Sequence, residues 1–489
     1  MNKKKTLLIC SVLLLGLIFA ILSFQRVKAD DVEEYVFENI SGGVKITKYN
    51  GIKESVTIPS NLFGKKIIEI GDNAFKDNTL IKNLTIPDNI RTIGSGAFAG
   101  CTGIESITIP VDVEYNTVRS EEIGKIPSFQ GCSSVKKITY TKGETGIMPD
   151  RVDGNNDNSG KYFKLDCLEF QNIENNTLKE VIFEEGVTHI GDHAFDISVV
   201  FPSEHITSVI LPATVTSIGS YTFYGQHDMT ISSLENVTEF GSFAFYDCAS
   251  ITELKLNKEL TEIPAYTFGR CCGIKTEDGP LIIPESVKVM GSGAFCECDN
   301  ITEITIPVDI EYDGHSTNSS YYSGSDASTF AGCLRIKRIT YTKGKTGKMP
   351  DREMYNSSMG SYDKKYYWDY SLEYPSINYG NLKEVIFEEG ITHIGDYAFA
   401  TYYSAPYSNS GGEGITSVIL PATVTSIGKA AFSGQDNMTI SSLENVTEFG
   451  SFAFYDCASI TELKLNKELT EIPAYTFGRC CGIKTEDGP

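Results

Sequence analysis

Thiols are the side chains of this protein with the widest chemistry, because they form disulfides, bind metals and act as nucleophiles. Of the 13 cysteines, eight stand three residues after a recurring phenylalanine: Cys101, Cys132, Cys248, Cys271, Cys298, Cys333, Cys457 and Cys480. The same position, here called the cysteine slot, holds Asn78, Gln226 and Gln435 in other places. A position that accepts Cys, Asn or Gln indicates a buried turn that needs a small, weakly polar group. We therefore expect buried free thiols in the slot.

The remaining cysteines leave other chemistry open. Many cysteines in an exported chain favour disulfides, and Cys167, Cys272, Cys296 and Cys481 could pair with neighbours. The sequence has no Cys-x-x-Cys pair of the kind found in zinc sites, and Cys296-x-Cys298 alone is a weak metal signal. A cysteine nucleophile needs a paired histidine at one site, whereas the slot recurs along the whole chain.

Histidines and acidic loops give weak metal signals. His189 and His193 could bring two imidazoles together, but the related pair later in the chain is His393 and Tyr397, and the segment is predicted to be strand and turn. Asp150–Gly160 resembles a calcium loop, yet its glycine and terminal acid are out of place for an EF-hand. Six scattered histidines single out no Ser-His-Asp arrangement. We expect structural histidines, no metal, no cofactor and no catalytic residue.

These residues must be positioned by a repeat, and its clearest copy is Ile81–Cys101. The pattern starts again at Ile104, 23 residues on. A fixed apolar template at such a period is typical of a stacked array. Alternation around Leu84 predicts a short strand. Pro87 ends the strand because it lacks an N–H, and Gly94 permits a tight turn.

One coil of this kind is too small to fold alone, since its few apolar side chains do not offset the entropy of ordering its backbone. Stacked coils share their apolar faces and can fold together. Thirteen interior phenylalanines mark the coils: Phe75, Phe98, Phe129, Phe195, Phe223, Phe245, Phe268, Phe295, Phe330, Phe399, Phe432, Phe454 and Phe477. We therefore predict a mainly β solenoid of about thirteen coils with short parallel strands.

The recurring I-x-x-I-x-I-P-x-x-I-x-x-I-G-x-x-A-F-x-x-C, as in Ile81–Cys101, resembles the BspA-like (Treponema pallidum type) leucine-rich repeats. Ile138–Gly143 and Ile339–Gly344 are similar to a longer variant repeat of that family, and the resemblance covers about residues 50–489. It implies a leucine-rich repeat solenoid in an exported or surface-attached bacterial protein. Several members bind host proteins or other cells, and the resemblance brings no catalytic residues.

The N-terminal residues are typical of an export signal. Residues 1–29 contain Lys3-Lys4-Lys5 and the apolar run Thr6–Phe24, the pattern of a signal peptide. The run is also long enough to span a membrane, so an uncleaved N-terminal anchor is an alternative. We predict a β-rich N-terminal cap over residues 30–58 and the solenoid, with irregular loop insertions, over residues 59–489.

The solenoid contains an internal duplication of about 200 residues, roughly 81–280 and 281–489. Met229–Pro280 and Met438–Pro489 are identical over 52 residues. The chain continues into a new coil after the first copy and stops after the second. Because a bare coil end would expose an apolar face and strand edges, we expect that the sequence stops within a repeat and that a C-terminal portion is missing.

Charge restricts the class of partner. The formal net charge is −22, and without residues 1–29 the chain has 37 basic and 64 acidic side chains, a net charge of −27. A strongly acidic body argues against nucleic acid and anionic membranes as partners. The sequence has no second long apolar run. We therefore expect no membrane span in the mature chain unless the signal is retained.

Insertions interrupt several coils, and in repeat arrays insertions map to loops, often on the binding side. Glu353–Asn381 and Ala400–Gly414 are rich in Tyr, Ser, Gly and Asn, a composition suited to binding. The candidate ligand-binding residues are Tyr355, Tyr362, Tyr366, Tyr367, Trp368, Tyr370, Tyr374, Tyr402, Tyr403 and Tyr407. The alternative is that these rings pack against the solenoid, because a long loop needs a small core of its own.

Together these features favour a non-enzymatic, secreted or cell-surface leucine-rich repeat protein. It would mediate protein–protein interaction or adhesion to host or neighbouring cells, with proteins or cell-surface glycoconjugates as ligands. An alternative from another class is an accessory binding region or spacer of a larger secreted hydrolase, whose catalytic domain would lie beyond Pro489. No motif specifies the ligand or the oligomeric state.

Overall fold

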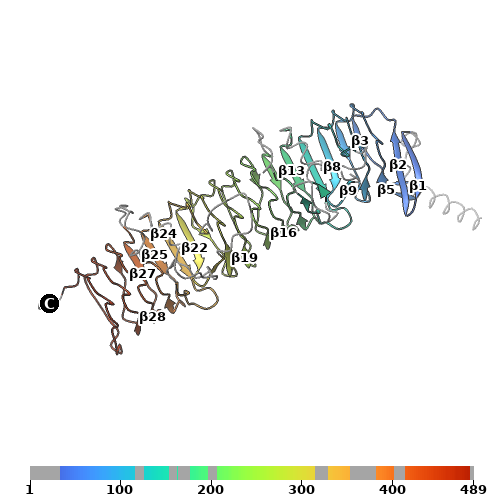
Figure 1. Cartoon of the computed structure of the whole chain (residues 1–489). Coiled ribbons are helices and arrows are strands. Elements are labelled where there is room, and N and C mark those ends of the chain that lie inside the picture. The colour runs from blue at the N-terminus through green and yellow to red at the C-terminus, as the bar shows by residue number, and fades with distance from the viewer. Residues whose placement is uncertain are drawn as a thin grey trace, which may run out of the picture.

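The computed structural model describes residues 34–115, 126–152, 162–163, 177–196, 206–313, 329–352, 381–400 and 414–484. In these ranges the secondary structure consists of β-strands and turns, and the coils stack into one elongated array (Figure 1). The prediction of a mainly β solenoid is therefore confirmed. Within the described ranges, no helix has the length and apolar character needed to cross a membrane.

The N-terminal end of the described chain is a hairpin. Its strands β1 (Tyr35–Ile40) and β2 (Gly43–Tyr49) pair antiparallel, and β2 then pairs in parallel with β5 (Lys65–Ile70). The Tyr49 ring stacks on Phe75 with ring centroids 4.9 Å apart, so the hairpin covers the first interior ring. The sheet also contains β4 (Asn61–Leu62), β7 (Thr92–Ile93) and β9 (Glu114–Tyr115).

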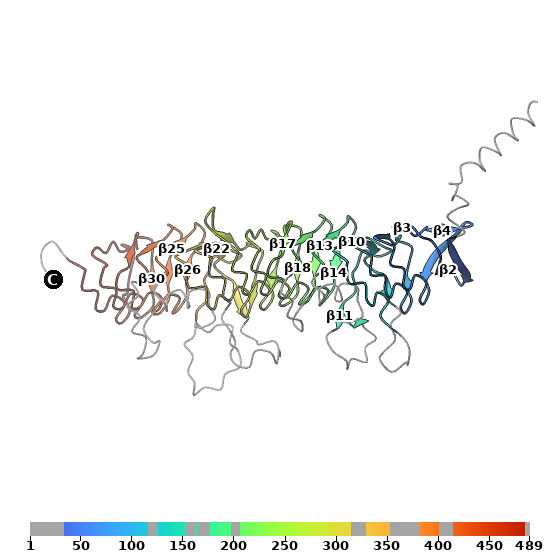
Figure 2. The same cartoon turned by 90° about the horizontal axis from the view of Figure 1, so that it is seen from above.

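Two long parallel sheets follow each other along one edge of the stack, where β10, β13, β17, β22 and β25 lie in Figure 2. The first long sheet consists of β3 (Ser55–Thr57), β6 (Asn83–Thr85), β8 (Ser106–Pro110), β10 (Lys137–Thr141), β13 (Glu180–Phe183), β15 (Ser208–Ile210) and β17 (Thr230–Ile231). The second consists of β20 (Leu281–Ile282), β22 (Glu303–Pro307), β24 (Arg338–Thr342), β25 (Glu384–Phe387), β27 (Ser417–Ile419) and β29 (Thr439–Ile440). Neighbouring strands come from successive coils, which is the topology of a solenoid.

Shorter parallel sheets form where each coil turns inward again after its long-sheet strand. One contains β14 (His189–Ile190), β16 (Ser217–Ile218) and β18 (Glu239–Phe240), and the next contains β19 (Glu262–Ile263), β21 (Val289–Gly291) and β23 (Glu311–Asp313). The third contains β26 (His393–Ile394), β28 (Ser426–Ile427) and β30 (Glu448–Phe449), and a separate pair joins β11 (Arg151–Val152) to β12 (Tyr162–Phe163).

The interior phenylalanines stack from coil to coil. Twelve of the thirteen are buried, and Phe477 is partly buried. From Phe195 to Phe330 the ring centroids of successive phenylalanines are 5.3 to 5.7 Å apart. At the longer coil after β10, Tyr140 stacks on Phe183 of the next coil at 5.1 Å and contacts Phe195 edge-on at 6.3 Å. The predicted mutual burial of the coils is confirmed.

The cysteine slot is a hydrogen-bond donor position. All eight slot thiols are unpaired, and each lies 2.9 to 3.2 Å from the carbonyl oxygen of the phenylalanine one coil earlier. The Gln226 and Gln435 amides donate at 2.7 Å to the same carbonyl in their coils. The expected buried free thiols are confirmed. A donor that reaches this carbonyl explains why Cys and Gln both fit.

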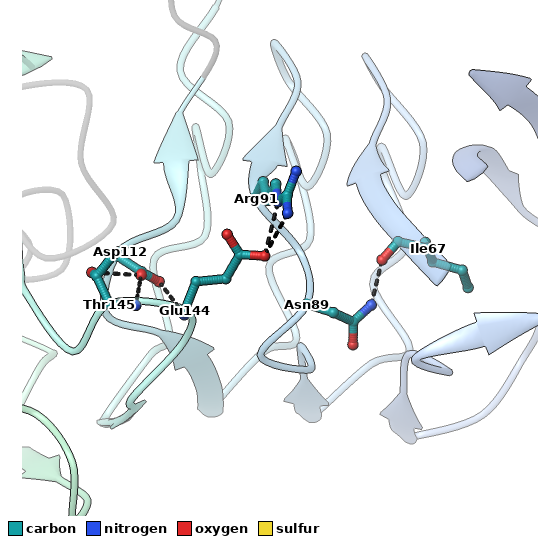
Figure 3. Close-up of polar contacts among 6 residues, drawn as sticks. All are labelled: Ile67, Asn89, Arg91, Asp112, Glu144 and Thr145. Carbon is teal, nitrogen blue, oxygen red and sulfur yellow. Dashed lines mark hydrogen bonds and ion pairs between the residues drawn. The ribbon is translucent and has the colours of Figure 1, made fainter. Parts of the chain in front are cut away.

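The longer coil after β10 is tied to two earlier coils (Figure 3). The Asp112 carboxylate accepts hydrogen bonds from the backbone N–H and the hydroxyl of Thr145 at 2.6 and 2.7 Å. The Glu144 carboxylate accepts a hydrogen bond from Arg91 at 2.8 Å. Two earlier coils are joined in a similar way, because the Asn89 amide donates to the Ile67 carbonyl. Gly143 has a φ of +64°, and a Cβ there would lie 1.8 Å from the Asp112 carboxylate, so this turn requires glycine.

Candidate interaction surface

The ten aromatic residues predicted to bind a ligand lie in 353–380 and 401–413, outside the described residues. The structure does describe the ends of these insertions. Arg352, Leu382, Ala400 and Ile415 are all buried, and the Arg352 guanidinium lies 5.2 Å from the centre of the Tyr312 ring. Both insertions therefore leave and rejoin the solenoid at packed positions.

The outward face of each long sheet carries a row of β-branched side chains in register, here called the outward row. The pairing aligns Thr85, Thr108, Thr139, Ile182 and Ile210 in the first sheet. It aligns Ile282, Thr305, Thr340, Ile386 and Ile419 in the second. Ile210, Ile282 and Ile419 are 40, 59 and 39% exposed, so each row offers apolar surface to a partner.

Ion pairs between neighbouring coils border the outward rows. Lys136 contacts Glu105 at 2.9 Å, and Lys137 contacts Glu180 at 3.0 Å. Arg338 bridges Glu303 at 3.1 Å and Glu384 at 2.5 Å in the second sheet. The hydrogen bond from Lys136 holds the pKa of Glu105 below its usual value, which favours the charged form of this carboxylate in its pair. Exposed pairs of this kind give charge patterning more than stability.

The two long sheets are separated by a break. Between β17 and β20, the segment Thr252–Leu256 alternates outward and inward side chains but pairs with no described strand; we call it the unpaired segment. On the opposite side of the same coils, the Phe243 and Phe245 N–H groups donate to the carbonyls of Ala265 and Thr267 at 3.0 and 2.9 Å. The coils thus stay joined along the phenylalanine side and part along the sheet side.

Sequence departures on both sides of the unpaired segment account for the break. Ser232 and Ser233 follow β17 and are exposed, at the positions where the preceding coil has Ile210 and Leu211. Asn257 replaces the strand-ending proline, and its amide donates to the Glu235 carbonyl at 2.6 Å. Four extra residues, Glu277–Pro280, precede β20, which shifts this strand relative to the template. Neither flank therefore has the register that pairing requires.

Grooves open on both sides of the unpaired segment. The larger, of about 1410 Å³, lies between it and β20 and is lined by Leu254, Leu256, Leu281 and Ile282 among other residues. A second, of about 390 Å³, lies between it and β17. The corresponding groove in the second copy is about 190 Å³, and there a bridge joins Leu443 to Leu465. The break is therefore most open in the middle of the array.

A column of stacked aromatic rings runs beside the phenylalanine side. The rings of His193, Tyr221, Phe243 and Tyr266 stack with centroids 4.8, 4.7 and 4.6 Å apart, and each residue has a φ between +56° and +59°. In the sequence, His193, Tyr221 and Phe243 each stand two positions after a recurring glycine and Tyr266 two positions after Pro264, a spacing that could have revealed this column. Because its rings stack on one another, we interpret it as a structural element.

The described polar side chains favour structural roles over catalysis. His189 contacts Ser217 at 3.0 Å, whereas His193 contacts Asp196 at 2.8 Å, so the two imidazoles have different partners. No group of three or more His, Cys, Asp or Glu residues within the described ranges could hold a metal. Burial raises the pKa of Cys101 to about 11, which keeps this thiol protonated and weakly nucleophilic at neutral pH.

The fold and this surface define a solenoid of the leucine-rich repeat class. Residues 45–152, 197–325, 325–405 and 407–487 match the BspA type leucine-rich repeat region, in six copies. The chain therefore belongs to this family, and the resemblance seen in its repeat is confirmed. The family is a protein-interaction repeat fold that is generally non-catalytic.

Several solved structures similar to this chain are bacterial leucine-rich repeat proteins. One from Bacteroides ovatus is 21% identical with a TM-score of 0.38, and the match covers 89% of this chain and 94% of the Bacteroides chain. A leucine-rich cell surface protein of Faecalibacterium prausnitzii is 20% identical with a TM-score of 0.29, covering 86% and 93%. The Treponema pallidum leucine-rich repeat protein is 18% identical with a TM-score of 0.20, covering 50% and 78%. Among curated proteins none matches this chain.

Proposed function

We propose that this protein is exported and displayed outside the cell, where it binds proteins or cell-surface glycoconjugates without catalysis, in adhesion to host or neighbouring cells. The observation that supports this function most directly is the pair of outward rows. The first row carries the exposed Ile210 and the second carries Ile282 and Ile419, on a sheet face that the solenoid repeats, which suits contact with an extended partner.

The tyrosine-rich insertions supply a second set of contacts in this proposal. They begin and end at buried residues such as Arg352 and Ile415. Tyrosine and tryptophan combine a large contact area with a polar tip. Contacts from the insertions and from the outward rows would add, because linked weak sites raise the overall affinity.

Binding of the whole chain to a bacterial or host cell surface tests this function. The test variant replaces Tyr362, Tyr366, Tyr367, Trp368, Tyr370 and Tyr374 with serine. We expect surface binding to weaken by at least about tenfold while the thermal midpoint stays unchanged. A lowered midpoint with surface binding unaffected would instead show that these rings pack on the solenoid, and absence of binding by the unaltered chain would contradict the adhesive function.

A further inference from the structure

We propose that the break between the two long sheets is a binding site for one extended strand of a partner protein, with side chains that alternate between apolar and basic. The inference rests on the proposed interaction function and names the kind of partner for one surface. The strand would lie in the larger groove, between the unpaired segment and β20, and would make the sheet continuous there.

Backbone hydrogen bonding argues for a peptide strand. No backbone hydrogen bond joins Glu253, Leu254 or Lys255 to any part of the chain that the structure describes. Among the described strands, β20 pairs with β22 alone, so its other edge faces the groove. By contrast, β8 pairs on both sides, with β6 and β10. A row of N–H and C=O groups without strand partners is a template for another extended backbone.

The lining of the groove selects the side chains of the strand. Leu254 and Leu281 form a buried floor, and Ile282 is 59% exposed at the rim, the most exposed isoleucine of either outward row. Alternate apolar side chains of a bound strand would face this floor, because side chains on a strand point to opposite faces with a period of two.

The charge at the groove favours basic residues at the other positions. Glu235, Glu277, Asp278 and Glu285 line it as exposed carboxylates. Lys255 also lines it, but its ammonium group contacts Glu253 at 2.7 Å, so its charge is largely balanced. The lysines left are Lys258 and Lys275, fewer than the four carboxylates. A strand with lysine or arginine at its outward positions therefore meets complementary charge.

Size and net charge disfavour other occupants. A groove of about 1410 Å³ exceeds the usual range of roughly 300–1,000 Å³ for small-molecule pockets. A second copy of the chain would have to bring its own net charge of −22 to an acidic rim, which self-repulsion opposes. An extended basic segment of a different protein meets neither obstacle.

The test uses the full chain and a fluorescent, end-blocked peptide of alternating lysine and valine. Fluorescence anisotropy measures its affinity beside two controls: the same peptide with alternate backbone amides N-methylated, and a peptide of alternating glutamate and valine. We expect the N-methylated peptide to bind at least about tenfold more weakly, since it keeps charge and side chains but loses half of its backbone donors, and the glutamate peptide to bind more weakly still.

Chain variants localise the binding. Deletion of Glu277–Pro280 restores the template spacing before β20 and should close the groove. We expect this deletion to weaken peptide binding at least about tenfold with an unchanged thermal midpoint. I282T, which removes a rim side chain, should weaken it severalfold. The matched variant I419T, in the same row but in a strand paired on both sides, should leave it unchanged.

Three results would overturn the inference: no binding of the lysine–valine peptide, equal binding of its N-methylated form, or equal weakening by I282T and I419T. Self-association of the chain that competes with the peptide would assign the groove to a second copy instead. If the chain binds cell surfaces while the peptide does not bind the groove, this inference falls and the adhesive function stands. If the chain binds neither cell surfaces nor the peptide, the adhesive function and this inference are both rejected.

Discussion

Residues 229–280 and 438–489 share one sequence but differ in their surroundings. In the first copy Ile263 is fully buried within β19 and Phe268 is buried, because residues 281–313 stack on this coil. In the second copy Ile472 is 51% exposed, Phe477 is only partly buried, and no described residue stacks beyond them. The sequence of a coil sets what it can bury, and its neighbour decides whether it does.

The coil before each identical stretch differs as well, and its effect reaches into the stretch. In the first copy Tyr221 stacks on Phe243, which is buried. In the second copy Ala430 occupies the position of Tyr221, and Phe452 is only half-buried. Two identical phenylalanines thus differ in burial because two aromatic rings of the preceding coil, Tyr221 and Tyr224, are replaced in the second copy by Ala430 and Ser433.

Replacing the interior phenylalanine of each copy by alanine should give the largest difference between the copies in the free energy of unfolding that is lost. We expect F268A to lower the free energy of unfolding by about 3–5 kcal/mol, because the cavity is enclosed on both sides. F477A should cost less than half as much, since no coil among the described residues covers one side of Phe477. Urea unfolding followed by circular dichroism measures both losses, and equal losses would contradict the dependence on the neighbouring coil.

Exchanging the ring that stacks directly on this phenylalanine should change the stabilities of the two copies in opposite directions. We expect Y221A to lower stability and A430Y to raise it by about 0.5–1.5 kcal/mol, the contribution of one stacked aromatic pair. Both positions have a positive φ, 56° at Tyr221 and 50° at Ala430, so the backbone changes little. Thermal midpoints of the two variants and of the combined exchange provide the measurement, and a lower midpoint for A430Y would show that the second copy has no room for the ring.

Alkaline pH should weaken the stack through the slot thiols. Burial raises the pKa of Cys101 from 9.0 to about 11 in the folded chain. The folded state therefore holds this proton more tightly, so the associated stability is complete below pH 9 and is lost as pH rises towards about 11. The variant C101N, with the side chain that Asn78 supplies in its own coil, should show a smaller drop in urea midpoint between these pH values. An identical drop in both proteins would exclude the Cys101 thiol as a cause.

The smallest effect on stability is expected at the ion pair that joins the longer coil to an earlier coil. Arg91 and Glu144 form an ion pair at 2.8 Å, whereas the corresponding positions in the second copy hold Lys288 and Lys345. We expect K345E to raise the urea midpoint slightly and E144K to lower it slightly. Both shifts should vanish in about 1 M NaCl, where the Debye length is about 3 Å. Shifts that persist in salt would point to packing instead of charge.

The repeat itself could be predicted from spacing because each template residue has a local physical reason. Ile81, Leu84 and Phe98 are buried as expected, and the slot thiols are free. The role of the slot as a donor was not predicted, because its partner is a carbonyl of another coil, such as that of Phe75 for Cys101. A sequence pattern records side-chain types and gives no direct account of backbone groups one coil away.

The break was not predicted for a related reason. Thr252–Leu256 fits the apolar template, so its sequence indicates a strand like the others. Pairing fails because Ser232, Ser233 and the insertion Glu277–Pro280 change the register of the flanking segments, and register depends on both partners of a pair. The tyrosine-rich insertions remain a prediction for binding, since they lie outside the described residues.

Hydrogen exchange of the two identical stretches tests most directly whether a neighbouring coil decides how well a coil is buried. The substitution K467R, at an exposed position, changes the mass of peptides from the second copy, so a peptide of residues 467–480 can be told apart from one of residues 258–271. We expect amides of 262–271 to exchange at least about tenfold more slowly than those of 471–480, because in the part of the chain that the structure describes only 262–271 is covered by a following coil. Equal protection of the two segments would contradict the account.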